Sequence, residues 1–373
     1  MEKKYTESKI NISEVKGDVD YGAVMREFGL EPMSPFVEKM KADKIKLPVM
    51  YRRKLVIAQR DFGQIYNAIK NKKKFAVLTG LNPSGTLHFG NVMFVNQALF
   101  FQENGGEVFI PISNDETYVF KKSDSIEKAT QNAVEALSDM IALGLDPRKT
   151  HFFLSTKTAK VYELAIKLST KTTFSNMKAI FGFTNDTSPG QIFYGIVQSA
   201  HILYPQLPEH LGPCPTVVPI GIDQDPYMRL VRDMAERAGF MKPSSTNHIF
   251  MPGLQGGKMS GSKPETCIFL NECPETAKKK IMGAFSGGGA SLKEHREKGG
   301  NPDIDVACQW LKFMFEEDDR RLEEIFASYR NGSLSTGEVK NLLADKVSVF
   351  LKNHQKKRAA ARSAAAKIVD SQS

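Results

Sequence analysis

Thr79-Gly-Leu-Asn-Pro-Ser-Gly-Thr-Leu-His-Phe-Gly-Asn91 is a glycine-rich turn between two segments of different character. Residues 75–79 form an apolar run that predicts a buried strand, and residues 88–104 predict a helix that ends at Gly105-Gly106. Small residues in such a turn let the backbone approach a nucleotide, and the helix start offers free N–H groups and a positive dipole end to phosphate. This order of strand, turn and helix predicts an α/β nucleotide-binding fold.

The same alternation of short apolar runs and amphipathic segments continues beyond the turn. It predicts further strands at 107–112, 151–154 and 216–220, and a helix that is capped by Asp124 and runs to Leu143. Such an order is typical of a parallel sheet with crossover helices, and we expect the sheet to end near residue 220.

The character of the sequence changes after about Ala284. A glycine-rich patch at 286–290 precedes charged amphipathic segments without strand patterns. Ser335 and Glu338 form a capping box at the start of a last helix that can run to Val369. We therefore predict an N-terminal appendage at 1–50, a Rossmann-like parallel-sheet domain at 51–284 and a C-terminal helical domain at 285–373.

The composition is that of a globular protein, because hydrophobic residues make up 41% and charged residues 25% of the 373 positions. No run approaches eighteen apolar residues, and Met1 to Lys4 is followed by Tyr5-Thr-Glu7, not by an apolar targeting segment. We therefore expect a cytoplasmic protein without a membrane segment. Four cysteines without Cys-x-x-Cys spacing predict reduced structural thiols and no zinc site. The net charge of +9 favours a polyanionic partner.

A second glycine-rich segment is Gly256-Gly-Lys-Met-Ser-Gly-Ser-Lys263. Its glycines permit a closing motion, Lys258 can neutralise developing negative charge, and Ser260 and Ser262 can donate hydrogen bonds to phosphate. Taken alone, this segment fits an ordinary surface turn better than a phosphate-binding loop. His88 taken alone is likewise more often a capping or packing residue than a catalyst.

The two segments together resemble the His-Ile-Gly-His and Lys-Met-Ser-Lys-Ser signatures of class I aminoacyl-tRNA synthetases. Between them, Gly221-Ile-Asp-Gln-Asp-Pro-Tyr-Met-Arg-Leu-Val-Arg-Asp233 resembles the strand-to-helix segment of tryptophanyl-tRNA synthetases of the archaeal and eukaryotic kind. The same family pattern is matched at 178–183, 284–288, 294–296, 299–301 and 303–305. The resemblance covers roughly Tyr51 to the C-terminus.

This resemblance implies that the protein activates L-tryptophan with Mg-ATP and transfers it to tRNA(Trp). It makes Lys258 and His88 the catalytic residues, and it implies a homodimer whose 285–373 domain binds the tRNA anticodon. The implied ATP site comprises Thr79, Gly80, Ser84, His88, Gly90, Asn91, Gly221, Asp223, Lys258, Met259, Ser260 and Ser262. The implied amino-acid site comprises Leu78, Pro111, Glu116, Gln198 and Gln224. Apart from the Mg²⁺ that accompanies ATP, we expect no metal ion.

The chain departs from the family at several positions. Asn91 and Gly261 stand where the signatures commonly have a histidine and a lysine. Leu78 and Pro111 stand where eukaryotic tryptophanyl enzymes have a tyrosine and a glutamine that help read the indole. Alternatives are therefore a non-catalytic RNA-binding paralogue and a small nucleotidyltransferase without tRNA.

Tyrosine is the alternative amino acid, because tyrosyl enzymes share this architecture. Archaeal tyrosyl enzymes usually have a tyrosine and an aspartate where this chain has Leu78 and His201. A buried phenol without a partner forfeits about 1–3 kcal/mol, so the sequence favours tryptophan.

The predicted last helix has a basic end. Its cations are Lys352, Lys356, Lys357, Arg358, Arg362 and Lys367, with no acidic residue between them. A solvated terminal helix and an RNA contact both fit this pattern. We take Lys356, Lys357 and Arg358 as the hypothetical tRNA-binding residues.

Overall fold

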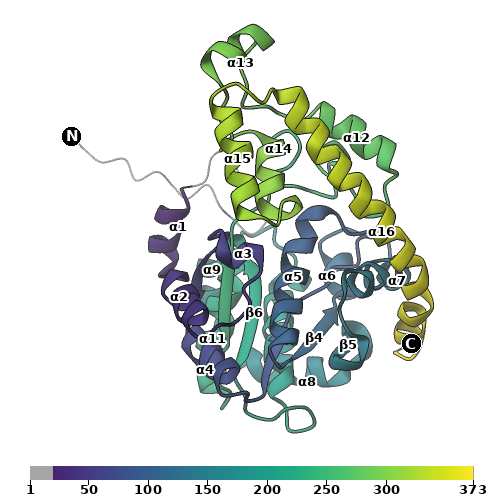
Figure 1. The fold of residues 1–373 in the computed structure, drawn as a ribbon. Coiled ribbons are helices and arrows are strands. Elements are labelled where there is room, and N and C mark those ends of the chain that lie inside the picture. The colour runs from purple at the N-terminus through teal and green to yellow at the C-terminus, as the bar shows by residue number, and fades with distance from the viewer. Residues whose placement is uncertain (1–19, 373) are drawn as a thin grey trace.

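The computed structural model describes residues 20–372, so residues 1–19 of the predicted N-terminal appendage and Ser373 lie outside the described part. The described part contains a seven-stranded sheet with the order β1-β2-β7-β6-β3-β4-β5 (Figure 1). The strands are β1 (Glu31–Pro32), β2 (Val56–Arg60), β3 (Phe75–Leu78), β4 (Gly106–Ile112), β5 (Thr150–Leu154), β6 (Thr216–Gly221) and β7 (Ser244–His248).

The four strands that the sequence predicts are confirmed as β3, β4, β5 and β6. Strand β3 is central and runs parallel to both β4 and β6, so the carboxyl ends of these strands meet at one edge of the sheet. Their residues are almost all buried, as expected for a parallel sheet that is covered on both faces. The α/β Rossmann-like fold is therefore present.

The expectation that the sheet ends near residue 220 is wrong. Strand β7 pairs in parallel with β6, and β2 and β1 then extend the sheet in the antiparallel direction. Strand β7 is Ser-Ser-Thr-Asn-His, five polar residues that are all buried. Hydrophobic periodicity does not reveal such a strand, because its side chains are accommodated by hydrogen bonds and not by apolar contacts.

Helices cover both faces of the sheet and connect its strands. They are α1 (Tyr21–Phe28), α2 (Ser34–Ala42), α3 (Val49–Arg52), α4 (Phe62–Lys70), α5 (Phe89–Glu103), α6 (Asn114–Val119), α7 (Ile126–Leu143), α8 (Ala159–Ser169), α9 (Phe174–Phe181), α10 (Pro189–Leu203) and α11 (Asp225–Arg237). The predicted cap at Asp124 is wrong by one residue. Ser125 is the N-cap of α7 and accepts a hydrogen bond from the backbone N–H of Lys128, whereas Asp124 forms an exposed ion pair with the Lys128 ammonium.

The C-terminal part is helical throughout, and the structure describes no strand after β7 within residues 20–372. Its helices are α12 (Pro274–Met282), α13 (Leu292–Lys298), α14 (Val306–Trp310), α15 (Asp319–Arg330) and α16 (Thr336–Asp370). The predicted capping box is confirmed, because Ser335 and Glu338 exchange hydrogen bonds at the start of α16. Figure 1 shows α16 passing α12 and then α7 on its way to the C-terminus.

One hydrophobic cluster joins the helical part to the sheet and extends from Met33 to Val369. At its centre the ring of Phe89, at the start of α5, packs against Trp310, Phe315 and Phe350 with centroid distances of 5.6, 5.1 and 5.2 Å. The C-terminal helices therefore support the signature turn directly. Across residues 20–372, none of the helices has both the length and the apolar character that crossing a membrane requires.

Candidate active site

A cavity of about 360 Å³ lies where β3, β6 and β7 end and α5 and α11 begin. In parallel sheets, ligands bind beyond the carboxyl ends of the strands, so this is the expected position for a substrate site. The cavity is lined by thirteen of the predicted site residues, namely Leu78, Thr79, Gly80, His88, Gly90, Asn91, Glu116, Gln198, Gly221, Asp223, Gln224, Lys258 and Met259. Five separate segments of the sequence, at 78–91, 116, 198, 221–224 and 258–259, thus meet in one place.

Four of the residues predicted for the ATP and amino-acid sites do not line the cavity. Pro111 lies within β4, where it pairs with Phe153 of β5, one strand away from the cavity edge. Ser84 is exposed on the turn. Ser260 and Ser262 lie outside the cavity lining, and their hydroxyls hydrogen-bond each other at 2.8 Å.

His88 is both the N-cap of α5 and a wall of the cavity. Its Nδ1 accepts a hydrogen bond from the backbone N–H of Gly90 at 3.1 Å, and its own backbone N–H donates to the side chain of Asn91 at 2.9 Å. A side chain at residue 90 would place its Cβ only 2.9 Å from the imidazole, which explains the glycine of the His-x-Gly pattern. Asn91 therefore completes the helix cap in place of the second signature histidine.

The imidazole of His88 is neutral at physiological pH. Burial and, to a smaller extent, the nearby ammonium of Lys258 together lower its pKa to about 4. Because Nδ1 accepts the Gly90 hydrogen bond, the ring proton of the neutral form is on Nε2. His88 can therefore donate one hydrogen bond to an oxygen in the cavity.

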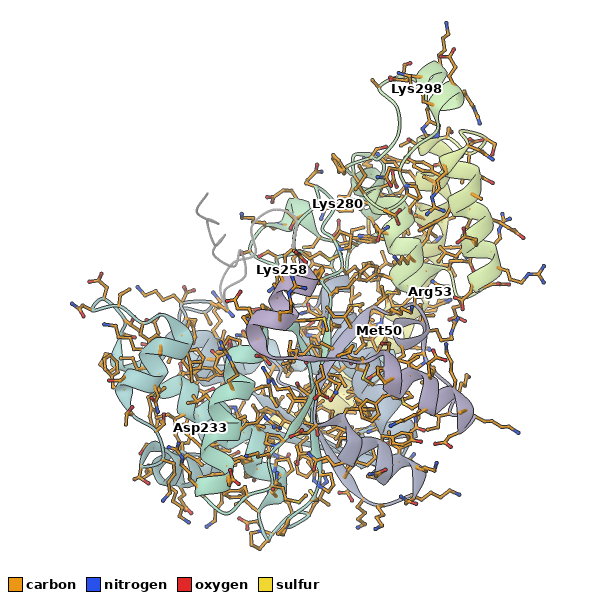
Figure 2. The ribbon with its side chains drawn as sticks, turned by 90° about the vertical axis from the view of Figure 1, so that its left-hand side faces the viewer. Met50, Arg53, Asp233, Lys258, Lys280 and Lys298 are labelled. Carbon is orange, nitrogen blue, oxygen red and sulfur yellow. The ribbon has the colours of Figure 1, made fainter. Side chains whose placement is uncertain are left out.

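Lys258 lies opposite His88 on the loop that follows β7. Its ammonium bonds the carboxylate of Asp223 at 2.6 Å and lies 4.8 Å from the ring centre of Phe250. Figure 2 shows Lys258 between Asp233 of α11 at the bottom and Lys280 of α12 nearer the top, which places the loop between the sheet and the helical part. A Cβ at Gly221 would lie 2.7 Å from the Asp223 carboxylate, so glycine is required beside this ion pair.

The other end of the cavity is built from α6 and α10. The hydroxyl of Tyr194 lies 3.1 Å from the carboxylate of Glu116 and 2.8 Å from the side-chain amide of Gln198. Leu78 is fully buried and presents an aliphatic wall at the end of β3. This end thus combines a carboxylate and an amide with apolar surface, a combination that suits the ammonium and the ring of an amino acid.

Sequence reasoning missed several residues of the site. Tyr227, His248 and Phe250 line the cavity, and Tyr194 lies behind it. Burial lowers the pKa of His248 to about 4 and raises the pKa of Tyr227, so both side chains are neutral polar groups. His248 is the last residue of β7 and Phe250 follows shortly after it, so a prediction of that strand would have placed them at the same sheet edge.

The basic end of α16 is divided in the structure. Lys356 and Lys357 are exposed. Arg358 instead faces α7, where its guanidinium bonds Asp139 at 2.7 Å and also contacts Glu135. The hypothesis that Arg358 binds tRNA does not fit this position, because its charge already serves to attach α16 to α7.

The described residues contain no group of three or more histidine, cysteine, aspartate or glutamate side chains that could hold a metal ion. Asp223, the carboxylate nearest Lys258, is engaged by that ammonium. This donor set fits a Mg²⁺ ion that is held by nucleotide phosphates and water.

A parallel sheet whose edge carries a His-x-Gly helix start and a Lys-Met-Ser loop on one cavity defines a class I aminoacyl-tRNA synthetase. Comparison with known proteins agrees: the profile of tRNA synthetases class I (W and Y) matches residues 70–352. The chain belongs to this family.

Individual relatives are similar over almost the whole chain. Tryptophan–tRNA ligase of Methanocaldococcus jannaschii is 43% identical over 94% of this chain and 95% of its own length. The enzyme of the same name from Pyrococcus abyssi is 39% identical over 94% of this chain and 91% of its own. The crystal structure of tryptophanyl-tRNA synthetase from Aeropyrum pernix superposes with a TM-score of 0.88 at 36% identity, covering 94% of this chain and 96% of that one.

Proposed function

We propose that this chain is a tryptophan–tRNA ligase, which activates L-tryptophan with ATP and transfers it to tRNA(Trp). The observation that carries the proposal is the convergence of His88 and Lys258 on one cavity at the sheet edge. The relatives named tryptophan–tRNA ligase, at 43% and 39% identity, support tryptophan as the amino acid.

In the first step, the carboxylate of tryptophan attacks the α-phosphate of ATP in line with the leaving pyrophosphate. Negative charge develops on the phosphate oxygens, so preorganised cations and N–H donors lower the barrier. Lys258 leaves Asp223 and neutralises this charge, while Nε2 of His88 and the free N–H groups at the start of α5 donate to the triphosphate. Asp223 keeps the lysine at the cavity before ATP binds. Once the lysine moves to the phosphate, Asp223 can accept a hydrogen bond from the ribose.

In the second step, the aminoacyl group passes to the terminal ribose of tRNA. We assign the anticodon-binding role to the helical domain at 285–373 and the chemistry to the sheet domain at 51–284. Lys356 and Lys357 are exposed on the last helix and remain the proposed tRNA contacts.

Tryptophan is favoured over tyrosine by Leu78 and His201, the two positions at which the sequence differs from archaeal tyrosyl enzymes. Leu78 offers no hydrogen-bond partner to a phenol, and His201 is buried behind Gln198, where it bonds Ser155 at 2.9 Å. A tyrosine hydroxyl in the cavity would lose about 1–3 kcal/mol for want of these partners.

Three further features belong to the proposal. The phosphates of ATP carry Mg²⁺ into the site, where it supplies positive charge to the triphosphate. The enzyme acts as a homodimer, and it works in the cytoplasm, where its tRNA is found.

Pyrophosphate exchange into ATP, measured with each of the twenty amino acids in turn, tests the proposal. Exchange that depends on tryptophan and is at least 100-fold slower with tyrosine is the expected result. Exchange with tyrosine alone would identify the alternative amino acid. Absence of exchange with every amino acid, together with retained tRNA binding, would identify a non-catalytic paralogue.

A further inference from the structure

A chain of buried polar side chains leads from α6 to the amino-acid end of the cavity. Asp115 accepts from the hydroxyl of Ser155 at 2.6 Å, Ser155 contacts Nε2 of His201 at 2.9 Å, and Nδ1 of His201 faces the amide of Gln198 at 3.5 Å. Ser155 and His201 are fully buried, and Asp115 is 8% exposed. Only Gln198 of these four lines the cavity.

Asp115 determines which group donates and which accepts in each hydrogen bond of this chain. A carboxylate only accepts, and Asp115 also accepts from the hydroxyl of Tyr162 at 2.9 Å and from the backbone N–H of Glu116 at 2.9 Å. The single proton of Ser155 is therefore committed to Asp115, and the 2.9 Å contact with His201 requires a proton on Nε2 of the ring.

The remaining ring nitrogen of His201 is consequently an acceptor. Burial lowers the pKa of His201 to about 4, so the ring is neutral and carries one proton, the one on Nε2. Nδ1 then presents a lone pair to the side chain of Gln198, and that lone pair needs a donor.

In the structure the Gln198 atom that faces Nδ1 is Oε1, which also accepts from the hydroxyl of Tyr194 at 2.8 Å. A half turn of the amide exchanges its oxygen and nitrogen at this end, so the hydrogen-bond partners decide between the two orientations. With the amide oxygen at this end, the one proton of Tyr194 would have to serve both Gln198 and the Glu116 carboxylate at 3.1 Å. The lone pair of His201 would in addition face an oxygen. With the amide nitrogen at this end, its two protons go to His201 and Tyr194, and Tyr194 donates to Glu116. The hydrogen-bonding needs of His201 and of Tyr194 thus both assign the amide nitrogen of Gln198 to the side that faces these two residues.

We propose that Asp115, Ser155 and His201 form a positioning relay that holds the Gln198 amide with its carbonyl oxygen toward the cavity, where it accepts an N–H from the ammonium group of the amino acid. The ammonium is the chosen donor because the Glu116 carboxylate shares Tyr194 with Gln198 and supplies a second acceptor on the same side. The identity of the ligand in this inference rests on the proposed function. The orientation of the Gln198 amide is independent of the proposed function.

Ser155→Ala tests the relay. Without the hydroxyl, Nε2 of His201 loses its acceptor, the ring proton can move to Nδ1, and the Gln198 amide turns its NH₂ group toward the substrate ammonium. We expect KM for tryptophan in pyrophosphate exchange to rise about 10- to 100-fold, the usual effect of losing a hydrogen bond to a charged group. KM for ATP and kcat should stay within about twofold. Ser199→Ala is the matched control, because Ser199 is equally buried on α10 but bonds only the carbonyl of Gly195 at 2.9 Å.

A double-mutant cycle separates positioning from general damage. In a Gln198→Met background the relay has nothing to orient, so adding Ser155→Ala should leave KM for tryptophan unchanged. Additive effects of the two substitutions would overturn the proposal, as would an unchanged KM in Ser155→Ala alone. A wild-type chain that shows no exchange with tryptophan would refute the proposed function instead.

A measurement without substrate tests the orientation by itself. The ¹⁵N spectrum of the histidine side chains at pH 7, with the signal of His201 assigned through His201→Phe, should show a protonated Nε2 and an unprotonated Nδ1. A proton on Nδ1 would place the Gln198 oxygen on the buried side and would overturn the relay.

Discussion

At the scale of single residues, the position of the Lys258 ammonium decides its role. Among the described residues of its loop, Lys258 is the only charged one that lines the cavity. Asp223 bonds it at 2.6 Å, and the Phe250 ring lies beneath it. Lys258→Ala should lower the rate of adenylate formation about 10²- to 10³-fold, because a preorganised donor to the developing charge is lost.

The rate is best measured by single-turnover formation of the adenylate. Lys263→Ala is the matched control, since Lys263 is an exposed lysine at the end of the same glycine-rich segment. An unchanged rate in Lys258→Ala, or an equal loss in Lys263→Ala, would contradict the assigned role.

At the scale of secondary-structure elements, the attachment of α16 to α7 depends on Asp139. This fully buried carboxylate accepts from Nε2 of His354 at 2.9 Å, from Arg358 at 2.7 Å and from the backbone N–H of Leu87 at 3.2 Å. Removing one partner of a buried ion pair leaves an uncompensated charge. Arg358→Ala should therefore lower the free energy of unfolding by about 3–5 kcal/mol.

Urea unfolding measures this loss, and Arg362→Ala is its control. Arg362 also pairs with α7, through Glu135 at 2.8 Å, but its side chain is 65% exposed. Its loss should cost less than about 1 kcal/mol. Equal losses in the two variants would show that the buried position of Arg358 is not what matters.

The exposed lysines of the same helix, Lys356 and Lys357, are the proposed tRNA contacts. Replacing Lys356 and Lys357 together with alanine should weaken tRNA binding and reduce the slope of log Kd against log salt by about two, one for each lost phosphate contact. Filter binding at several salt concentrations measures the slope. Lys72→Ala with Lys73→Ala, two exposed lysines just before β3, should leave it unaltered. A slope that does not change in the α16 variant would remove these lysines from the tRNA interface.

At the scale of the whole molecule, buried histidines make stability depend on pH. Burial lowers the pKa of His201 and of His248 to about 4 from an ordinary value near 6.5. Between these values the unfolded chain binds protons that the folded chain does not, so stability is complete above pH 6.5 and is lost as pH falls toward 4. Each of the two groups contributes up to about 1.4 kcal/mol per pH unit in this window.

Urea unfolding at a series of pH values checks this dependence. His248→Gln should make the slope between pH 6.5 and 4 shallower by about 1.4 kcal/mol per pH unit. A profile that has the same slope with and without the histidine would show that His248 is protonated in the folded protein.

The sequence alone determined the class of fold, and most of the residues that it singled out for the ATP and amino-acid sites line one cavity. Apolar runs at 75–79, 107–112, 151–154 and 216–220 predicted four parallel strands, because most strands that are buried on both faces are rich in apolar residues. His88 and Lys258 were predictable because their two segments together resemble the signatures of class I aminoacyl-tRNA synthetases, whereas each segment alone also fits a helix cap or a surface turn.

Tertiary structure decided what depends on partners distant in the chain. Strand β7 has no apolar pattern, and it became visible only through its pairing with β6 and β2. Arg358 carries the same charge as its lysine neighbours in the sequence, but only packing shows that it meets Asp139 and not solvent. The Asp115–Ser155–His201–Gln198 relay joins residues of three segments, and a hydrogen bond between remote residues leaves no periodic trace in the sequence.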